Sequence, residues 1–216
     1  MASLTRRATQ QGFSIIEIAV TLVVLGMLLA AAVPSIGTWT RNAKLRNQAE
    51  SLQSGLQQAR NEAVRRNRPI TFHMVNNSTT TLGNSCALSA SGSSWVVSVR
   101  SPAGACGATP TNSSTDAADP LIVASHLGAD GANGVSVSGL ASDNTTATDS
   151  VTFDALGRPM TFSGSGDAHR NLRRITVNYA SSQTDDRPLR VDITPAGMVR
   201  FCDTTITNTS DPRRCL

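Results

Sequence analysis

The stretch Gly12-Phe13-Ser14-Ile15-Ile16-Glu17 opens the longest apolar segment of this 216-residue chain. After Glu17, the 23 residues from Ile18 to Thr40 carry no charge and include the run AVTLVVLGMLLAAAV. A helix that crosses a bilayer needs about 20 mostly apolar residues, so the run has the length of a membrane span. This pattern excludes a plain cytosolic globule, and the apolar content is too high for a disordered chain.

The residues before this segment, 1–12, have the composition of a leader peptide. They read MASLTRRATQQG, with Arg6 and Arg7 and no acidic residue. In a secretory signal peptide a small-residue cleavage site follows the apolar run, whereas here the run continues through Pro34 into a polar helical pattern. The two arginines favour a cytoplasmic N-terminus with the rest of the chain exported.

Glu17 is the one charged residue inside this apolar context. A carboxylate at the centre of a membrane helix costs about 2.5–3.5 kcal/mol on insertion scales, and less near the interface. Two interpretations are open: an acid at the membrane interface, or an acid that waits for a positive partner inside an assembly.

The string Gly12-Phe13-Ser14-Ile15-Ile16-Glu17 resembles the class III signal of type IV prepilins and type II secretion pseudopilins. The resemblance implies that a prepilin peptidase removes residues 1–12 by cutting after Gly12, and that Phe13 becomes N-methylated. It also implies that Glu17 neutralises the terminal amine of a neighbouring subunit. A buried unpaired charge is costly, so this pairing would select both register and partner.

Beyond Pro34 the sequence predicts an amphipathic helix over residues 41–68. Apolar residues recur every three or four positions at Leu45, Ala49, Leu52, Leu56, Ala59 and Ala63, which is one face of a helix. The helix should end at Asn67 or Arg68 because Pro69 follows, and Pro34 should kink or loosen it. From Phe13 to Asn67 it would span about 80 Å, with residues 13–40 as the hydrophobic membrane or filament-core part.

This amphipathic part is basic, with seven Lys or Arg and two Glu over residues 41–68. Arg65, Arg66 and Arg68 fall in the last turn, where cations favour the negative helix end. A filament wall, an acidic partner surface and nucleic acid are the other interpretations of these cations.

Residues 69–216 read as a β-rich head in which short strands alternate with polar loops. The expected strands are 70–75, 95–100, 121–126, 135–138, 151–153, 160–162, 174–179, 189–193 and 198–202. Turns are expected at Asp154-Ala155-Leu156-Gly157 and Thr194-Pro195-Ala196-Gly197, and long polar loops at 101–119 and 139–150. We expect one antiparallel twisted sheet, or two small sheets, on the amphipathic helix.

The order of motifs in this half resembles the FimT/FimU and GspH group of minor pilins and pseudopilins. The match consists of the long helix, NRP, W-V-V-x-V, FDALGRP and a closing T-P-x-G-x-V-R-x-C, and rests on Pro69, Trp95, Phe153, Gly157, Arg158, Gly197 and Cys202. The resemblance implies the α+β type IV pilin fold, in which a long N-terminal helix packs on a C-terminal antiparallel β-sheet head.

The four cysteines, Cys86, Cys106, Cys202 and Cys215, all follow the apolar segment. An even number in an exported region indicates disulfides. Three pairings are possible, and the modest loop lengths favour Cys86–Cys106 and Cys202–Cys215, each worth ~2–4 kcal/mol.

The sequence offers no sign of catalysis, and we expect neither an enzyme nor a cofactor. No G-x-S-x-G, H-E-x-x-H or C-x-x-C occurs, and His73, His126 and His169 are scattered. We expect these histidines to lie at the surface of strands or loops, and no metal to be bound.

Three functions are consistent with these features, and the first is a minor subunit of a type IV pilus. It would join other minor and major pilins at or near the tip and help to start assembly. By the resemblance it would sit in the bacterial inner membrane as a single-pass protein with a periplasmic head, and then in a pilus on the cell surface. A type II secretion minor pseudopilin has the same parts in a different machine.

The third function is DNA binding for uptake. Some FimT-like pilins use a C-terminal G-R-x-R motif, and the matching string here, Gly197-Met198-Val199-Arg200, keeps only the second arginine. A local patch of Arg187, Arg190, Arg200, Arg213 and Arg214 would have to compensate. Net charge disfavours it, because residues 69–216 hold ten Arg and twelve Asp and DNA affinity depends on phosphate neutralisation.

Overall fold

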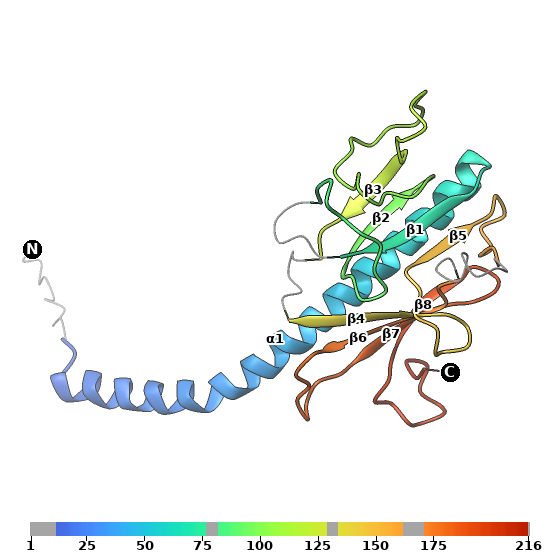
Figure 1. Cartoon of the computed structure of the whole chain (residues 1–216). Helices are drawn as coiled ribbons and strands as arrows, with labels where there is room; N and C mark the ends of the chain where they lie inside the picture. Colours follow the sequence, from blue (N-terminus) through green and yellow to red (C-terminus); the bar gives the residue numbers. More distant parts are fainter. Residues whose placement is uncertain (1–11, 77–81, 129–133, 162–170, 216) are drawn as a thin grey trace, which may run out of the picture. The chain divides into compact units, whose positions relative to one another are not determined.

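The computed structural model describes residues 12–76, 82–128, 134–161 and 171–215, apart from the side chains of residues 31–35. The chain divides into two compact units, Met1–Thr40 and Arg41–Leu216. The first unit contains the apolar part of a long helix, α1 (Ile15–Arg66), and the second contains the amphipathic part of α1 together with all the strands (Figure 1). The expected leader, residues 1–12, lies outside the described residues except for Gly12.

In the first unit α1 begins two residues after Phe13 and continues past Pro34. Ser14 caps the start, since its carbonyl accepts hydrogen bonds from the backbone N–H groups of Glu17 (3.1 Å) and Ile18 (3.2 Å). The helix is continuous at Pro34, so the missing N–H of the proline does not end it.

In the second unit one stripe of α1 is completely buried. The six residues of the predicted apolar face, Leu45, Ala49, Leu52, Leu56, Ala59 and Ala63, have no exposed surface. The helix ends at Arg66, and Asn67 then adopts a left-handed conformation with φ 49°. The N–H of Asn67 donates to the Val64 carbonyl and that of Arg68 to the Ala63 carbonyl, which is the Schellman arrangement that closes a helix. Pro69 follows as expected.

The strands form two antiparallel four-stranded sheets. Sheet one has the order β3 (Ile122–His126), β2 (Ser94–Ser98), β1 (Ile70–Val75) and β5 (Ser150–Phe153). Sheet two has the order β4 (Val135–Leu140), β6 (Arg174–Tyr179), β7 (Leu189–Ile193) and β8 (Val199–Asp203). The α+β fold with antiparallel sheets is therefore confirmed, in the form of two small sheets.

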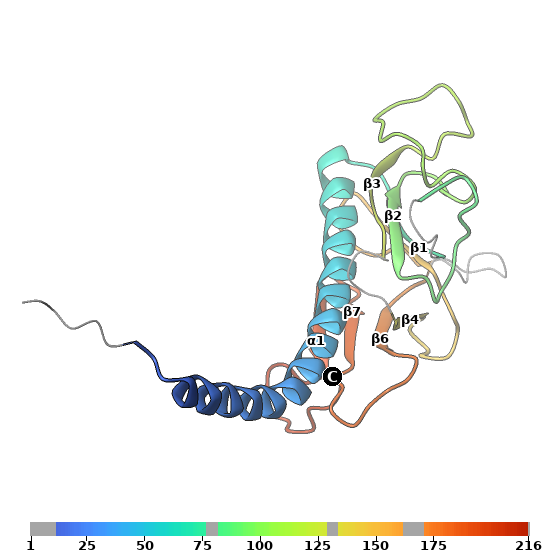
Figure 2. The same cartoon turned by 90° about the vertical axis from the view of Figure 1, so that its left-hand side faces the viewer.

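The core lies between the amphipathic part of α1 and the strands, which Figure 2 shows running beside the helix. Sheet two alternates buried and half-buried residues along β6 and β7, as expected for a sheet with one covered face. At Gly55 the helix lies close against sheet one, because a Cβ there would lie 2.8 Å from both the Phe72 and the Trp95 rings.

Two disulfides join the pairs that the sequence favoured. Cys86 is bonded to Cys106 and Cys202 to Cys215. The first is buried in a small separate cluster with Val75, Val96 and Ile122, under the polar loops that flank β2. The second ties the C-terminal segment to β8.

Several expectations about the head require correction. Strands 70–75, 174–179 and 189–193 coincide with β1, β6 and β7, and five others differ by one or two residues at their ends. At 160–162, however, Met160 is not in a strand and only Pro159 forms an isolated bridge, to Phe153; Phe162 lies outside the described residues. The turn at 154–157 thus leads into a single bridge instead of a hairpin.

The expected loop 139–150 is shorter, because Gly139 and Leu140 belong to β4 and Ser150 to β5.

The histidines also differ from expectation. His73 is buried, because β1 is an inner strand of sheet one and all six of its residues are covered. His126 is half-buried and stacks on Trp95 with ring centroids 5.7 Å apart. His169 lies outside the described residues.

Candidate functional site

The described N-terminal segment consists of three exposed residues followed by an apolar helix. Gly12, Phe13 and Ser14 precede α1, and the Phe13 side chain is exposed. Glu17 lies in the first helical turn with its side chain exposed, where the positive end of the helix dipole favours a carboxylate. A peptidase could reach the Gly12–Phe13 bond without unfolding any described helix.

The large apolar side chains that the structure describes between Phe13 and Leu29 are exposed. Ile15 is 89% exposed, and the other large residues up to Leu29 are at least half exposed. The exposed set is Phe13, Ile15, Ile16, Ile18, Val20, Leu22, Val23, Val24, Leu25, Met27, Leu28 and Leu29. An apolar patch of this size on a protein marks a surface that a lipid or another protein covers.

Among the described residues, no helix combines the length and the hydropathy that crossing a membrane requires.

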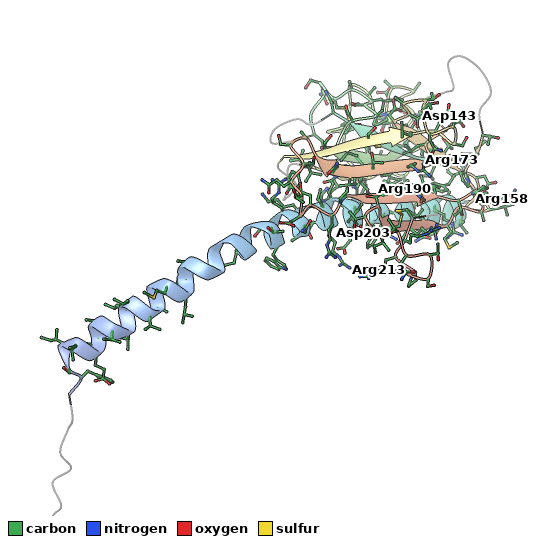
Figure 3. All side chains as sticks on the ribbon, turned by 90° about the horizontal axis from the view of Figure 1, so that it is seen from below. Asp143, Arg158, Arg173, Arg190, Asp203 and Arg213 are labelled. Carbon is green, nitrogen blue, oxygen red and sulfur yellow. A yellow bond between two sulfur atoms is a disulfide. The ribbon has the colours of Figure 1, made fainter. Side chains whose placement is uncertain are left out.

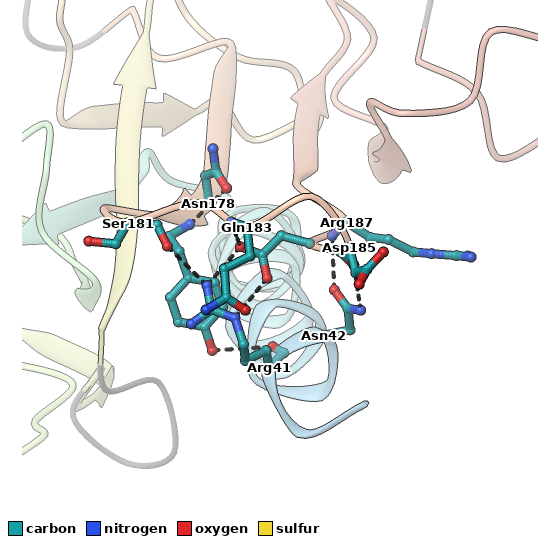
Figure 4. Close-up of polar contacts among 9 residues, drawn as sticks. Arg41, Asn42, Asn178, Ser181, Gln183, Asp185 and Arg187 are labelled. Atoms are coloured by element: carbon teal, nitrogen blue, oxygen red, sulfur yellow. Dashed lines mark hydrogen bonds and ion pairs between the residues drawn. The ribbon is translucent and has the colours of Figure 1, made fainter. Parts of the chain in front are cut away.

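A group of polar contacts holds the start of the amphipathic part of α1 on the head, at the loop between β6 and β7 (Figure 4). Arg41 donates from Nε to Asp186 Oδ1 (2.8 Å) and from Nη2 to Asp186 Oδ2 (2.7 Å). Its guanidinium carbon lies 3.8 Å from the centre of the Tyr179 ring, and Nη2 also donates to the Ser181 carbonyl. Such two-pronged arginine–carboxylate pairs are the geometrically specific ones.

The next residue repeats the attachment through backbone groups. Asn42 Nδ2 donates to the Asp185 carbonyl (3.0 Å), and the Arg187 N–H donates to Asn42 Oδ1 (2.8 Å). The hydrogen bond from Arg41 is the main reason that the pKa of Asp186 lies below its usual value. Arg41 and Asn42 thus attach the helix to Tyr179 and to the loop that follows it. We call this group of residues the Arg41 clamp: Arg41, Asn42, Tyr179, Asp185 and Asp186.

A second contact fixes the other end of the helix. Arg60 Nε donates to the Gly157 carbonyl (3.1 Å). Gly157 and Gly197 both have positive φ, of 75° and 82°, and a Cβ on Gly197 would lie 1.9 Å from the Gly157 oxygen. The two predicted turns thus touch each other above Arg60, and only glycine fits at the contact.

Sequence reasoning identified neither the Arg41 clamp nor the Arg60 contact. Arg41 is the first charge after the apolar run and Arg60 directly follows a buried stripe residue, Ala59. These positions could have marked the two arginines as candidates for contacts with the head. Their partners could not be predicted, because they lie about a hundred or more residues further along the chain.

The five arginines proposed for DNA lie on four segments. Arg190 is on β7 and Arg200 on β8, Arg187 lies in the loop before β7, and Arg213 and Arg214 are in the C-terminal segment. Figure 3 shows Arg190 on the sheet and Arg213 on the C-terminal loop.

Aspartates neutralise part of this set. Arg190 pairs with Asp192 (2.9 Å), which also pairs with Arg174 (3.2 Å). Arg213 pairs with Asp211 (2.8 Å), and this hydrogen bond is the main cause of the raised pKa of Arg213. A phosphate approaching sheet two would therefore meet carboxylates as well as guanidinium groups.

An open groove of about 930 Å³ lies at the edge of the head, beside the 154–157 turn. Its charged lining residues are Asp143, Asp154, Arg158 and Arg173. Both carboxylates are engaged by their own turns: Asp143 accepts from Thr145 and Thr146, and Asp154 from Leu156 and Arg158. Within the described ranges no group of three or more His, Cys, Asp or Glu residues could hold a metal ion.

The comparisons with known proteins account for most of the chain. The model of the family described as type II transport protein GspH matches residues 48–197. The chain belongs to the GspH family. The model of the prokaryotic N-terminal methylation motif matches residues 7–33, which include Gly12, Phe13 and Glu17.

The matched region of this GspH-family chain contains most of the features that shape the head. It runs from Gln48, on the buried side of α1, to Gly197, and so contains both glycine turns and Arg60. The resemblance noted from the sequence is confirmed at the level of the family.

The solved structures that resemble this family member include two crystal forms of the type IV minor pilin FimU of Pseudomonas aeruginosa. The form in space group P21 is 19% identical, with 80% of this chain and 98% of that chain covered and a TM-score of 0.47. The form in space group P65 is 18% identical, with 76% and 98% covered and a TM-score of 0.42. None of the curated proteins compared matches the chain.

Proposed function

We propose that the protein is a minor pilin that joins a type IV pilus at or near its tip and helps to start assembly. A prepilin peptidase would cut after Gly12 and Phe13 would be N-methylated. The protein would wait in the inner membrane with its head in the periplasm and then pass into the filament beside other minor and major pilins. This role is structural and needs no cofactor.

The observation that carries the proposal is the difference between the two units. The Arg41–Leu216 unit buries its own core between α1 and the strands, whereas the helix of the first unit leaves its large apolar residues exposed around a single acid, Glu17. A surface of this kind is stable only when a bilayer or neighbouring helices cover it. Because the methylation motif lies in the same segment, we favour a bilayer as the cover before assembly and neighbouring helices as the cover in the filament.

The test follows the full chain in its host. We expect sheared surface filaments to contain the protein with N-methyl-Phe13 as its first residue, and deletion of the gene to reduce piliation. Glu17→Gln should be cleaved normally but lost from filaments at least ~10-fold, because the neighbouring amine would then be buried unpaired. Ser14→Ala is the matched control, because it removes a polar group from the same segment without removing a charge.

A secretion pseudopilin is the second proposal, because the matching family model is that of type II transport protein GspH. It predicts the opposite phenotype: normal piliation with loss of protein secretion after deletion. That result would overturn the pilus assignment. A gene neighbourhood of minor-pilin genes supports the pilus, and a secretion operon supports the pseudopilus.

DNA binding is the weakest proposal, because Asp192 and Asp211 pair with two of the five arginines. Binding of labelled duplex DNA to the Arg41–Leu216 unit should be weak even at low salt, where electrostatic attraction is strongest. Tight binding that falls steeply with salt would favour a role in uptake.

A further inference from the structure

Three apolar side chains on the head lie open to solvent. Within the described part of the Arg41–Leu216 unit, the exposed large hydrophobic residues are Val64 (51% exposed), Leu156 (68%) and Met198 (58%). They come from the end of α1, the turn after β5 and the turn before β8.

These residues come from separate segments, and the two turns that carry Leu156 and Met198 lie against each other and against α1 at Val64. A Cβ on Gly157 would lie 3.1 Å from Val64 Cγ2, and one on Gly197 would lie 1.9 Å from the Gly157 oxygen. Leu156 and Met198 are the immediate neighbours of these two glycines. We call Val64, Leu156 and Met198 the apolar patch.

The surroundings of the apolar patch are positively charged. Arg60 lies under both turns, Arg158 follows Gly157, and Arg65 and Arg66 adjoin Val64. Glu62 is shared by Arg65 and Arg66, each at 2.6 Å, and Asp154 pairs with Arg158. These four arginines and two carboxylates give the residues around the apolar patch a formal charge of +2.

We infer that the apolar patch is a docking site for an acidic, apolar-centred surface on a different subunit of the same filament, an inference that rests on the proposed function. An apolar centre with a charged rim is the usual composition of a protein interface, and an acidic rim on the partner would complement the arginines.

A second copy of this chain fits less well. Its described head exposes large apolar residues only at the same basic patch, and two such patches would bring like charges together. DNA also fits less well. Met198 is an exposed apolar residue at the position where the G-R-x-R motif has its first arginine, and it cannot pair with a phosphate.

The first experiment maps what the patch touches. The photocrosslinker p-benzoyl-phenylalanine replaces Met198 in the full chain in living cells, with Ala117, an exposed residue of the 101–119 loop, as the matched control position. We expect an adduct from position 198, and not from 117, whose peptide belongs to an acidic surface of another filament subunit. An adduct with a second copy of this chain, with DNA or with lipid, or no adduct specific to position 198, would overturn the inference.

The second experiment measures the consequence. Met198→Glu should reduce the amount of the protein in sheared filaments roughly 10-fold, which corresponds to about 1.4 kcal/mol. Met198→Leu keeps the apolar surface and Ala117→Glu adds the same charge elsewhere, so both should match the wild type. Melting temperatures of all variants show whether the head remains folded.

The docking site can fail independently of the proposed function. A wild-type chain that is missing from filaments contradicts the proposed function and this inference with it. A wild-type chain that enters filaments together with an equally retained, folded Met198→Glu variant contradicts the docking site alone.

Discussion

At the residue scale, Gly197 is the position where adding one methyl group should cost the head most. Its φ of 82° and its contact with the Gly157 oxygen leave no room for a Cβ. We expect Gly197→Ala to lower the free energy of unfolding by about 2–4 kcal/mol, through backbone strain and overpacking together. Urea denaturation of the Arg41–Leu216 unit measures this change.

Gly83→Ala is the matched control, because nothing lies within 4 Å of a Cβ at that glycine. It should be neutral or slightly stabilising, since alanine has fewer unfolded conformations to lose. Equal effects of the two substitutions would show that the stacked turns contribute nothing to stability.

The Arg41 clamp should make stability depend on pH at the acid end. The pKa of Asp186 is lowered in the folded state, chiefly by the hydrogen bond from Arg41. The stabilisation is therefore complete above the unfolded pKa of an aspartate, about 3.9, and is lost as the pH falls through the lower folded value. We expect Asp186→Asn to be less stable than the wild type at pH 6 and to lose less stability between pH 5 and pH 2.

Asp185→Asn is the control for this prediction, because the neighbouring Asp185 contributes its backbone carbonyl to the clamp and its side chain is exposed. Its acid profile should follow that of the wild type. If Asp186→Asn also follows the wild type, the clamp is not coupled to protonation.

At the scale of elements, the distance between α1 and sheet one depends on Gly55. The rings of Phe72 and Trp95 occupy the space that a side chain there would need. Gly55→Leu should therefore destabilise the head by about 1–3 kcal/mol, despite the better helix propensity of leucine.

Ser54→Leu places the same side chain one residue earlier, on an exposed position of the same helix. Its effect should stay within about 0.5 kcal/mol. A Gly55→Leu variant as stable as Ser54→Leu, measured by thermal melting, would mean that the helix can shift on the sheet without cost.

At the scale of the whole molecule, the two units should separate in their behaviour. The Arg41–Leu216 unit contains the buried stripe, both sheets and both disulfides. Expressed alone, it should be monomeric in buffer and should unfold in one transition seen alike by near- and far-UV circular dichroism. The full chain should require detergent, because the apolar side chains of its first unit are exposed. Aggregation or separate transitions of the isolated unit would contradict this division.

The local patterns of the chain predicted its elements well. The stripe from Leu45 to Ala63 is buried at every predicted position, because helical periodicity is a property of neighbouring residues. Pro69 predicted an end at Asn67 or Arg68, one or two residues after the observed end at Arg66, and eight of the nine expected strands are present. His73 was placed wrongly because burial on both faces of β1 depends on segments far along the chain.

The amino-acid sequence by itself therefore determined the apolar N-terminal segment with its single acid, the amphipathic helix and the antiparallel strands. Each depends on residue spacing within a few turns or one strand. Only the tertiary structure decided that the strands form two sheets, that Arg41 meets Asp186, and that the turns at Gly157 and Gly197 lie against each other. Those pairings join residues up to about 145 positions apart, and packing of the whole head, not local preference, selects them.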